Sequence, residues 1–305
     1  MRKISLVFFI LFANYFEVFG QIYFDESFEF SDFETFKEIS EERERWTFFH
    51  SENQDFDNNG KIDPWENIKM ISFDDNNTDD SFIHFYLKRM NEGILRNDVM
   101  KNGEINNEKV DYHNFFTHIA RNEIATWDSP NQTSYWPNQN YYFEFEIMVP
   151  DDFVFESQNC SNPSKSNYEL TGQWHFSYAV LKGQTMSPIS LRIVCNQWML
   201  NLNPNNDKEE KDTDFISLGN IEKGKWVNWK FQIKFSNKKR GKIKVWKNGL
   251  LVFSKEKSKN IFAKKVNGLP VTVYLKIGVY KPHWWSRESD VSEREINFDN
   301  VKVSY

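Results

Sequence analysis

Residues 273–280 read Val-Tyr-Leu-Lys-Ile-Gly-Val-Tyr, and this stretch decides the fold class because it alternates strictly. With the two-residue period of a β-strand, one face carries Tyr274, Lys276, Gly278 and Tyr280, and the other carries four aliphatic residues. Aliphatic side chains suit a core, whereas two phenols and an ammonium group suit the floor of a groove. The stretch therefore predicts a strand with a core face and a chemically useful face.

Similar alternation recurs along the chain, and periodic helix is almost absent. The dipeptide Asn248-Gly249 separates two such runs, as in a two-residue β-hairpin turn. The abundant aromatic residues, 29 Phe, 12 Tyr and 11 Trp, also favour sheets. The pattern predicts an all-β fold, an antiparallel β-sandwich of jelly-roll (concanavalin A-like) type. The expected strands, besides 273–280, are 46–49, 80–87, 115–125, 141–149, 170–178, 190–201, 226–235, 241–247, 250–253 and 296–303.

Residues 1–20 have the form of a secretory signal peptide. A basic start, Arg2-Lys3, precedes a short apolar run, and cleavage is expected after Gly20. The run is too short for a membrane anchor, so we expect a secreted or periplasmic protein whose residues 21–305 form a single monomeric domain. Export favours a disulfide between Cys160 and Cys195, with a pair of free buried thiols as the alternative.

The net charge of −6 gives no reason to expect nucleic acid as a partner. Residues 223–265 are locally basic, which we interpret as the solvated surface of a hairpin. The alternative is a positive field that steers an anionic polymer toward the protein.

Residues 55–66, DFDNNGKIDPWE, match the twelve-residue calcium loop of an EF-hand. Gly60 stands at the sharp turn and Ile62 at the apolar position. We therefore predict a structural calcium ion and no organic cofactor; an Asp/Asn-rich turn without an ion is the alternative. The expected ligands are Asp55, Asp57, Asn59, Lys61 through its carbonyl, Asp63 and Glu66.

Three of the expected strands present polar faces. Arg121 shares a face with Glu123, Gln173 shares one with His175, and the third face is that of residues 274–280. Taken singly, each set has an ordinary structural explanation, such as a cross-strand ion pair or a satisfied core histidine.

Taken together, these side chains suit β-elimination on a uronic acid. Such a reaction requires the sugar carboxylate to be neutralised, which Arg121 and Gln173 can do by hydrogen bonding. A base must then remove the C5 proton, which suits His175, and an acid must protonate the departing O4, which suits Tyr280.

The three stretches resemble the signature strands of jelly-roll polysaccharide lyases: R-x-E-L at Arg121–Ile124, Q-x-H at Gln173–His175, and Y-F-K-x-G-x-Y at Tyr274–Tyr280. The resemblance implies cleavage of an anionic polysaccharide that contains uronic acid, giving unsaturated uronate ends. It also implies that Lys276, Tyr274 and Glu123 contact substrate or orient the groups that do. Ala125 and Pro282 depart from the alginate lyase pattern and favour the glucuronan or heparin lyase I branch.

Directly after this strand comes an aromatic and basic segment with Trp284, Trp285 and Arg287. These side chains could form a lip that stacks on sugars and binds carboxylates. The alternative is a loop anchored by tryptophan packing.

Two other functions remain open at this point. A glycoside hydrolase on the same sandwich needs two carboxylates across the cleavage point, and the pair Glu144 and Glu146 lacks the expected sequence context. A non-catalytic, lectin-like carbohydrate-binding module would explain the aromatic residues, but not the assembly of Gln173, His175, Lys276 and Tyr280.

Overall fold

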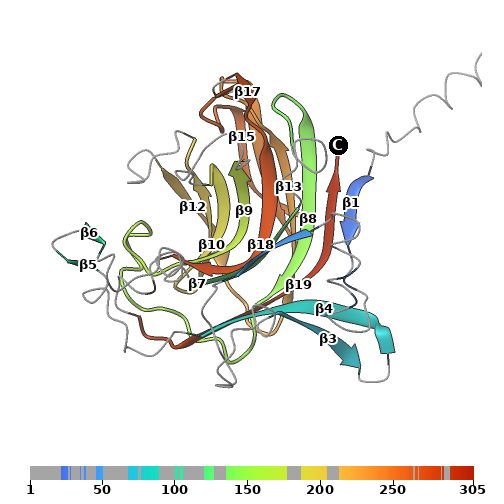
Figure 1. The fold of residues 1–305 in the computed structure, drawn as a ribbon, viewed down its shortest axis with the longest axis vertical. Coiled ribbons are helices and arrows are strands. Elements are labelled where there is room, and N and C mark those ends of the chain that lie inside the picture. Colours follow the sequence, from blue (N-terminus) through green and yellow to red (C-terminus); the bar gives the residue numbers. More distant parts are fainter. Residues whose placement is uncertain are drawn as a thin grey trace, which may run out of the picture.

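Alternating side chains build two large antiparallel sheets in the computed structural model of the chain (Figure 1). Apart from the helical positions Thr35 and Glu38, every regular element of the described residues is a strand. No helix in this part of the chain is long and apolar enough to cross a membrane. The structure describes residues 22–26, 28, 35, 38, 46–50, 68–74, 77–88, 100–101, 104–105, 120–126, 135–176, 187–204, 213–263, 265–266, 268–282, 284 and 289–305.

The first sheet has eight strands in the order β15-β14-β13-β8-β19-β4-β3, with β1 also paired to β19. Its central strands β8 and β13 alternate cleanly and bury every second side chain. The bounds are β1 Ile22–Glu26, β3 Ile68–Asp74, β4 Asn77–Lys88, β8 Asn140–Met148, β13 Trp226–Lys234, β14 Gly241–Lys247, β15 Leu250–Ser258 and β19 Glu293–Ser304.

The second sheet has seven strands in the order β12-β11-β10-β9-β18-β7-β2. Its central strands are buried on both faces, unlike those of the first sheet. The bounds are β2 Trp46–His50, β7 Ala120–Thr126, β9 Glu169–Phe176, β10 Ile189–Val194, β11 Gln197–Leu202, β12 Asp214–Asn220 and β18 Val273–Lys281. Two small hairpins pair β5 (Met100–Lys101) with β6 (Glu104–Ile105), and β16 (Lys265–Val266) with β17 (Leu269–Pro270).

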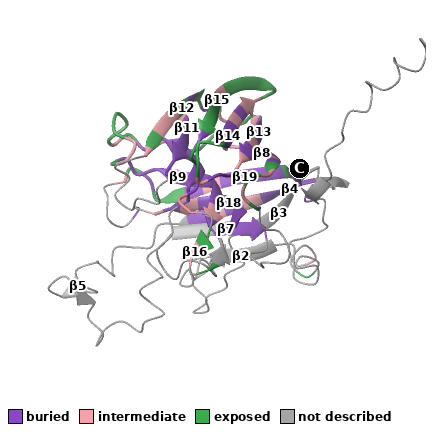
Figure 2. Cartoon of the chain, turned by 90° about the horizontal axis from the view of Figure 1, so that it is seen from above, coloured by how far each residue is buried: buried purple, intermediate pink, exposed green. Residues whose placement is uncertain are grey.

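One aromatic-rich core lies between the two sheets (Figure 2). Trp174 from the second sheet contacts Phe143 and Phe231 of the first, with ring centroids 5.4 and 4.6 Å apart. The four aliphatic residues of 273–280 belong to this core, which confirms the predicted core face. The predicted fold class, an antiparallel jelly-roll sandwich, is confirmed.

The hairpin turn at Asn248-Gly249 is also confirmed, because both residues have positive φ, 49° and 77°, as a type I′ turn requires. The run 190–201 was predicted wrongly as one strand. It is two strands, β10 and β11, joined by a turn at Cys195-Asn196, where Cys195 has a φ of 52°.

Candidate active site

The three sequence stretches singled out above lie on neighbouring strands. β18 sits between β9 and β7 near the middle of the seven-stranded sheet. The backbone register therefore places the predicted site residues in rows across the sheet, on the face away from the core. The directly opposite pairs are Tyr274 with His175, Lys276 with Gln173, Gly278 with Glu123, and Tyr280 with Arg121. The side chain of Arg121 lies outside the described part of the structure.

Gln173 has its side-chain amide held from both ends. Its Nε2 donates a hydrogen bond to Glu123 Oε1, and its Oε1 accepts one from Ser187 Oγ at 2.7 Å. An ionised carboxylate can only accept hydrogen bonds, so the amide nitrogen must face Glu123. The orientation of the Gln173 amide is therefore fixed by its neighbours.

Among the described residues, the partners of Glu123 are Gln173 and Lys276, whose Nζ lies 3.8 Å from Glu123 Oε2. Glu123 and Lys276 are 1% and 4% exposed. A charge buried this deeply is stable only with a partner of opposite sign. The two side chains compensate each other next to the amide of Gln173.

His175 is half-buried, and its ring nitrogens have different roles. Nδ1 lies 3.0 Å from the backbone carbonyl of Phe176. A carbonyl oxygen can only accept, so the neutral ring carries its proton on Nδ1 and its lone pair on Nε2. The buried ring of Tyr274 lies beside it, with centroids 5.4 Å apart. Tyr274 thus packs against His175, and its place in the structure is that of a supporting side chain.

Tyr280 is half-buried and follows an irregularity in β18. Gly278 has a φ of 133°, and the register with β9 shifts between Ile277 and Tyr280. Only glycine adopts such a φ easily, and an extra residue in a strand re-aims the side chains that follow. Gly278 is thus needed for the bulge that directs Tyr280.

Two further polar side chains, missed by the sequence reasoning, continue the row that contains Lys276 and Gln173. Ser190 of β10 lies opposite Gln173, and Asn201 of β11 lies opposite Ser190. Ser190 also accepts a hydrogen bond from Arg192 Nε at 3.0 Å. The turn at Cys195-Asn196 creates this alignment, and a sequence read as one continuous strand could not reveal it.

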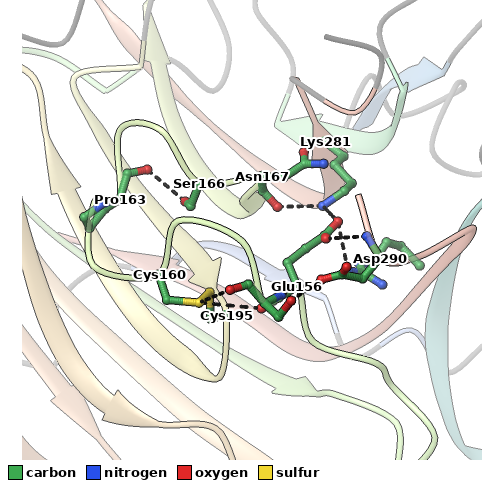
Figure 3. The surroundings of a disulfide bond; sticks show 10 residues. Glu156, Cys160, Pro163, Ser166, Asn167, Cys195, Lys281 and Asp290 are labelled. Atoms are coloured by element: carbon green, nitrogen blue, oxygen red, sulfur yellow. Dashed lines mark hydrogen bonds and ion pairs between the residues drawn. A yellow bond between two sulfur atoms is a disulfide. The ribbon is translucent and has the colours of Figure 1, made fainter. Parts of the chain in front are cut away.

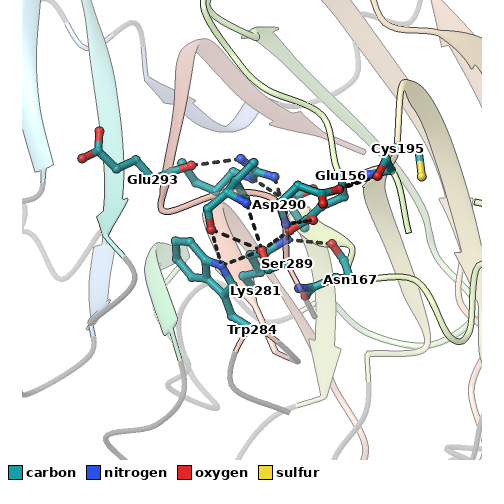
Figure 4. A network of polar contacts seen from close by, with 12 residues as sticks. Glu156, Asn167, Cys195, Lys281, Trp284, Ser289, Asp290 and Glu293 are labelled. Carbon is teal, nitrogen blue, oxygen red and sulfur yellow. Dashed lines mark hydrogen bonds and ion pairs between the residues drawn. The ribbon is translucent and has the colours of Figure 1, made fainter. Parts of the chain in front are cut away.

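A buried cluster of four charged side chains lies at the C-terminal end of β18, on the face opposite that of Tyr280 (Figures 3 and 4). Lys281 Nζ lies 2.8 Å from Glu156 and 2.6 Å from Glu169, and Arg294 Nε binds Glu169 as well. All four side chains are at most 2% exposed. We call Glu156, Glu169, Lys281 and Arg294 the charge cluster; its formal charges sum to zero.

The charge cluster shifts the pKa values of two members. Burial lowers the pKa of Lys281, because desolvation disfavours the ammonium form more than its carboxylate neighbours favour it. Burial alone would raise the pKa of Glu169, but Arg294 and Lys281 outweigh it and hold that pKa below its ordinary value. Glu169 is therefore a carboxylate at neutral pH.

The Cys160–Cys195 disulfide, which confirms the predicted pairing, anchors the loop that carries Glu156 (Figure 3). Cys195 is at the β10–β11 turn and Cys160 follows Glu156 by four residues. In the same loop, the backbone N–H and the hydroxyl of Ser157 bind Asp290 at 2.8 and 2.6 Å. The bond thus fastens the charge cluster's loop to the sheet that bears the candidate site.

Trp284 corrects one of the sequence predictions. It is fully buried, its Nε1 donates to the carbonyl of Val291 at 3.1 Å, and its ring lies 5.7 Å from Lys281 Nζ (Figure 4). A side chain without exposed surface does not stack on a sugar, so packing, the alternative reading, holds for Trp284. Trp285 and Arg287 lie outside the described residues.

The two carboxylates considered for a hydrolase lie in the other sheet. Glu144 forms an ion pair with Lys230 at 2.7 Å, and Glu146 accepts a hydrogen bond from Asn300 Nδ2 at 3.1 Å. Both point away from the core, on β8. They are therefore remote from the face that carries Gln173, His175 and Tyr280.

The basic segment 223–265 also has the ordinary explanation. Lys242 and Lys244 both approach Glu256, at 3.2 and 3.6 Å, and Lys255 pairs with Asp214 at 2.6 Å. The predicted signal peptide and the calcium loop at 55–66 lie outside the described residues. Among the residues that the structure describes, no group of three or more His, Cys, Asp or Glu side chains is placed to hold a metal ion.

Comparison with solved structures supports the fold. The endo-β-1,4-glucuronan lyase of the fungus Trichoderma reesei aligns with a TM-score of 0.52 and 15% identity, over 85% of this chain and 94% of that chain. The alginate lyase from Klebsiella pneumoniae aligns with a TM-score of 0.50 and 12% identity, over 86% and 95%. No curated protein sequence matches the chain. The family model described as polysaccharide lyase, however, matches residues 57–302, and the chain therefore belongs to the polysaccharide lyase family and is an enzyme of that class.

Proposed function

We propose that the enzyme cleaves a uronic-acid-containing anionic polysaccharide by β-elimination and leaves unsaturated uronate ends. The observation that carries this proposal is the alignment of Lys276 with Gln173, Tyr274 with His175 and Tyr280 with Arg121 on three adjacent strands. These positions supply hydrogen-bond donors, a base and an acid on one face of one sheet.

Carboxylate neutralisation is assigned to Gln173 and Arg121. The Gln173 amide nitrogen carries two N–H groups, one of which binds Glu123. The second donates to the substrate carboxylate, together with the guanidinium of Arg121. Withdrawing charge from the carboxylate makes the neighbouring C5 proton acidic enough to remove.

Proton transfer is assigned to His175 and Tyr280. His175 Nε2 holds the lone pair, because Nδ1 faces the Phe176 carbonyl, and it takes the C5 proton. The C5–H electron pair forms the C4–C5 double bond as the C4–O4 bond breaks, and the Tyr280 hydroxyl protonates O4. These two side chains are half-buried, whereas Gln173 and Lys276 are 4% exposed, so the proposed proton carriers are the more accessible members of the set.

The electrostatics favour an acidic sugar. Lys276 and Glu123 cancel, whereas Arg192, bonded to Ser190, and Arg121, opposite Tyr280, each add a positive charge. A bound carboxylate would offset part of this charge, which favours an anionic over a neutral sugar in a buried site. Glucuronan and heparin-like polymers are the candidates, since the Trichoderma reesei enzyme is a glucuronan lyase.

Export and calcium complete the proposal. Residues 1–20 would direct the protein out of the cytoplasm, and residues 55–66 would bind a calcium ion that stabilises the fold. The protein would act as a monomer on an extracellular or periplasmic polymer.

The test is turnover of glucuronan, alginate and heparin by the purified protein, followed by the ultraviolet absorbance of the C4–C5 double bond. Tyr280→Phe should abolish turnover and keep the melting temperature. Tyr142→Phe is the matched control, because Tyr142 accepts a hydrogen bond from Gln232 on the outer face of the other sheet and should retain full activity.

Other results would point elsewhere. New reducing ends without the absorbance would indicate hydrolysis, and binding without either would indicate a lectin-like module. Full activity of Tyr280→Phe would remove Tyr280 from the acid role.

A further inference from the structure

We propose that Lys281 is a positioning residue for Tyr280, and that the charge cluster aims the phenol at the substrate from the opposite face of the strand. This inference rests on the proposed function, in which Tyr280 is the acid. The two residues are neighbours at the end of β18, with the side chain of Tyr280 on the outer face of the sheet and that of Lys281 toward the interior.

The ammonium group of Lys281 is completely satisfied. It has three N–H donors and three acceptors: the Asn167 carbonyl at 2.6 Å, Glu169 at 2.6 Å and Glu156 at 2.8 Å (Figure 4). Three bonds in different directions fix the position of Nζ. Because the side chain is 0% exposed, surrounding packing fixes the stem as well, and the backbone next to Tyr280 is held in place.

The pairing of β18 is irregular next to Tyr280, where the contacts of Lys281 hold the backbone. On its β9 side, the ladder is interrupted between Ile277 and Tyr280, around Gly278 with its φ of 133°. On its β7 side, the described pairing runs to Lys281 opposite Ala120. A bulge loosens regular pairing next to Tyr280, which is the first residue of β18 to pair with β9 again, opposite Leu170. The contacts of Lys281 restrain the same backbone from the interior face of the sheet.

Stability alone does not account for the charge cluster. Burying ions costs desolvation energy, and well-packed apolar side chains of similar volume are often as good or better. A cluster of ion pairs does, however, impose one geometry, because each hydrogen bond has a preferred distance and direction. Precise geometry is what an acid needs, since a shift of about 1 Å in a reacting group can cost on the order of 100-fold in rate.

The cluster also links Tyr280 to three separate parts of the fold. Glu169 begins β9, the strand of Gln173 and His175, and Arg294 comes from β19 in the other sheet. Glu156 lies in the loop tied down by the Cys160–Cys195 bond, and its Oε2 accepts the backbone N–H of Asp290 at 2.9 Å. The cluster thereby fixes the position of the proposed acid, Tyr280, relative to the strand that carries the proposed base, His175.

The experiment compares Lys281→Met with wild type on whichever polymer of the panel wild type cleaves fastest. We expect kcat to fall roughly 10- to 100-fold while KM stays within about twofold, because substrate contacts are kept and only the acid is displaced.

Two further variants separate positioning from stability. Lys281→Met combined with Glu156→Gln leaves only Glu169 with Arg294, a neutral pair, and it decides the question if the single variant does not fold. Ile243→Ala creates a cavity in the core part of β14 in the other sheet and is the control for lost stability. It should lower the melting temperature and leave kcat unchanged.

Wild-type kcat in folded Lys281→Met or in the neutral double variant would overturn the inference. So would an equal fall of kcat in Ile243→Ala, because destabilisation would then explain the loss. An inactive Tyr280→Phe beside a fully active Lys281→Met would refute the positioning role and leave the proposed function intact. A fully active Tyr280→Phe would refute both.

Discussion

Removal of the Cys160–Cys195 bond should destabilise the protein by an amount that depends on the number of residues between the two cysteines. The two cysteines are 35 residues apart. Loop-closure entropy for a loop of that size gives about 4 kcal/mol at 25 °C. At roughly 2 °C per kcal/mol for a domain of this size, the melting midpoint should fall by about 8 °C.

The assay is thermal unfolding of wild type and of the double variant Cys160→Ser/Cys195→Ser, each with and without a thiol reductant. Reductant should lower the midpoint of wild type toward that of the variant. It should leave the variant unchanged, which is the control for other effects of the reductant. A count of free thiols in the unfolded protein verifies the starting state.

An unchanged midpoint in the double variant, with the bond present in wild type, would refute the reasoning. It would mean that the unfolded chain is already restrained between these residues, so the bond removes no entropy. A fall far above 8 °C would show instead that the bond's main contribution is to the native packing around Glu156.

Three further predictions concern buried groups. Trp284→Phe loses the hydrogen bond to Val291 and should cost about 1–3 kcal/mol in urea unfolding with KM unchanged; a raised KM with unaltered stability would restore the sugar-stacking role. The pKa of Glu169 is lowered because two buried cations, Arg294 and Lys281, outweigh its desolvation. The carboxylate therefore stabilises the folded protein above the ordinary glutamate pKa, and this stabilisation is lost as pH falls through the pKa of the folded state. The free energy of unfolding in urea should fall with decreasing pH, and it should fall less in Glu169→Gln; the same pH dependence in both proteins would contradict the assignment. Burial and the carboxylate of Glu293 raise the pKa of Tyr86 to about 12, so stability should decrease as pH rises from 10 toward that value. Tyr86→Phe should remove a step near pH 12 from a phenolate absorbance titration; an unchanged titration there would contradict the assignment.

The strands β8, β13 and β14 of the first sheet could be predicted closely, because they face water on one side, whereas β3 was not among the expected strands. In β13, residues 226–234 alternate between buried and half-buried, and the polar and apolar letters alternate with them. The turn at Asn248-Gly249 had its own local signal, since both residues tolerate positive φ. Local chemistry and local structure agree there.

The second sheet was harder to predict because its central strands are buried on both faces. β10 and β11 are buried almost throughout, so no alternation marks where one strand ends. The turn at Cys195-Asn196 contains neither glycine nor proline. Without either signal, residues 190–201 read as one strand, and the alignment of Ser190 with Asn201 was lost.

The charge cluster could not have been found from single residues. Glu156 and Glu169 are separated from Lys281 and Arg294 by more than a hundred positions, and each reads as an ordinary surface charge. The pairing of β18 with β9 brings Lys281 to Glu169, while Arg294 arrives from β19 and Glu156 from the loop after β8. The candidate site residues were singled out because their types fit one reaction, and reaction chemistry gives no such guide to the interior of the protein.

The two faces of β18 treat charge in opposite ways. On the interior face, Lys281 belongs to a cluster whose charges cancel, as a buried site without a ligand requires. On the outer face of the sheet, Lys276 is paired with Glu123, whereas Arg192, bonded to Ser190, and Arg121, opposite Tyr280, leave positive charge. The protein as a whole carries −6, so its overall field would repel an anionic polymer. For the proposed uronate polymer, recognition would therefore come from short-range contacts on this face, where a sugar carboxylate would offset the positive charge.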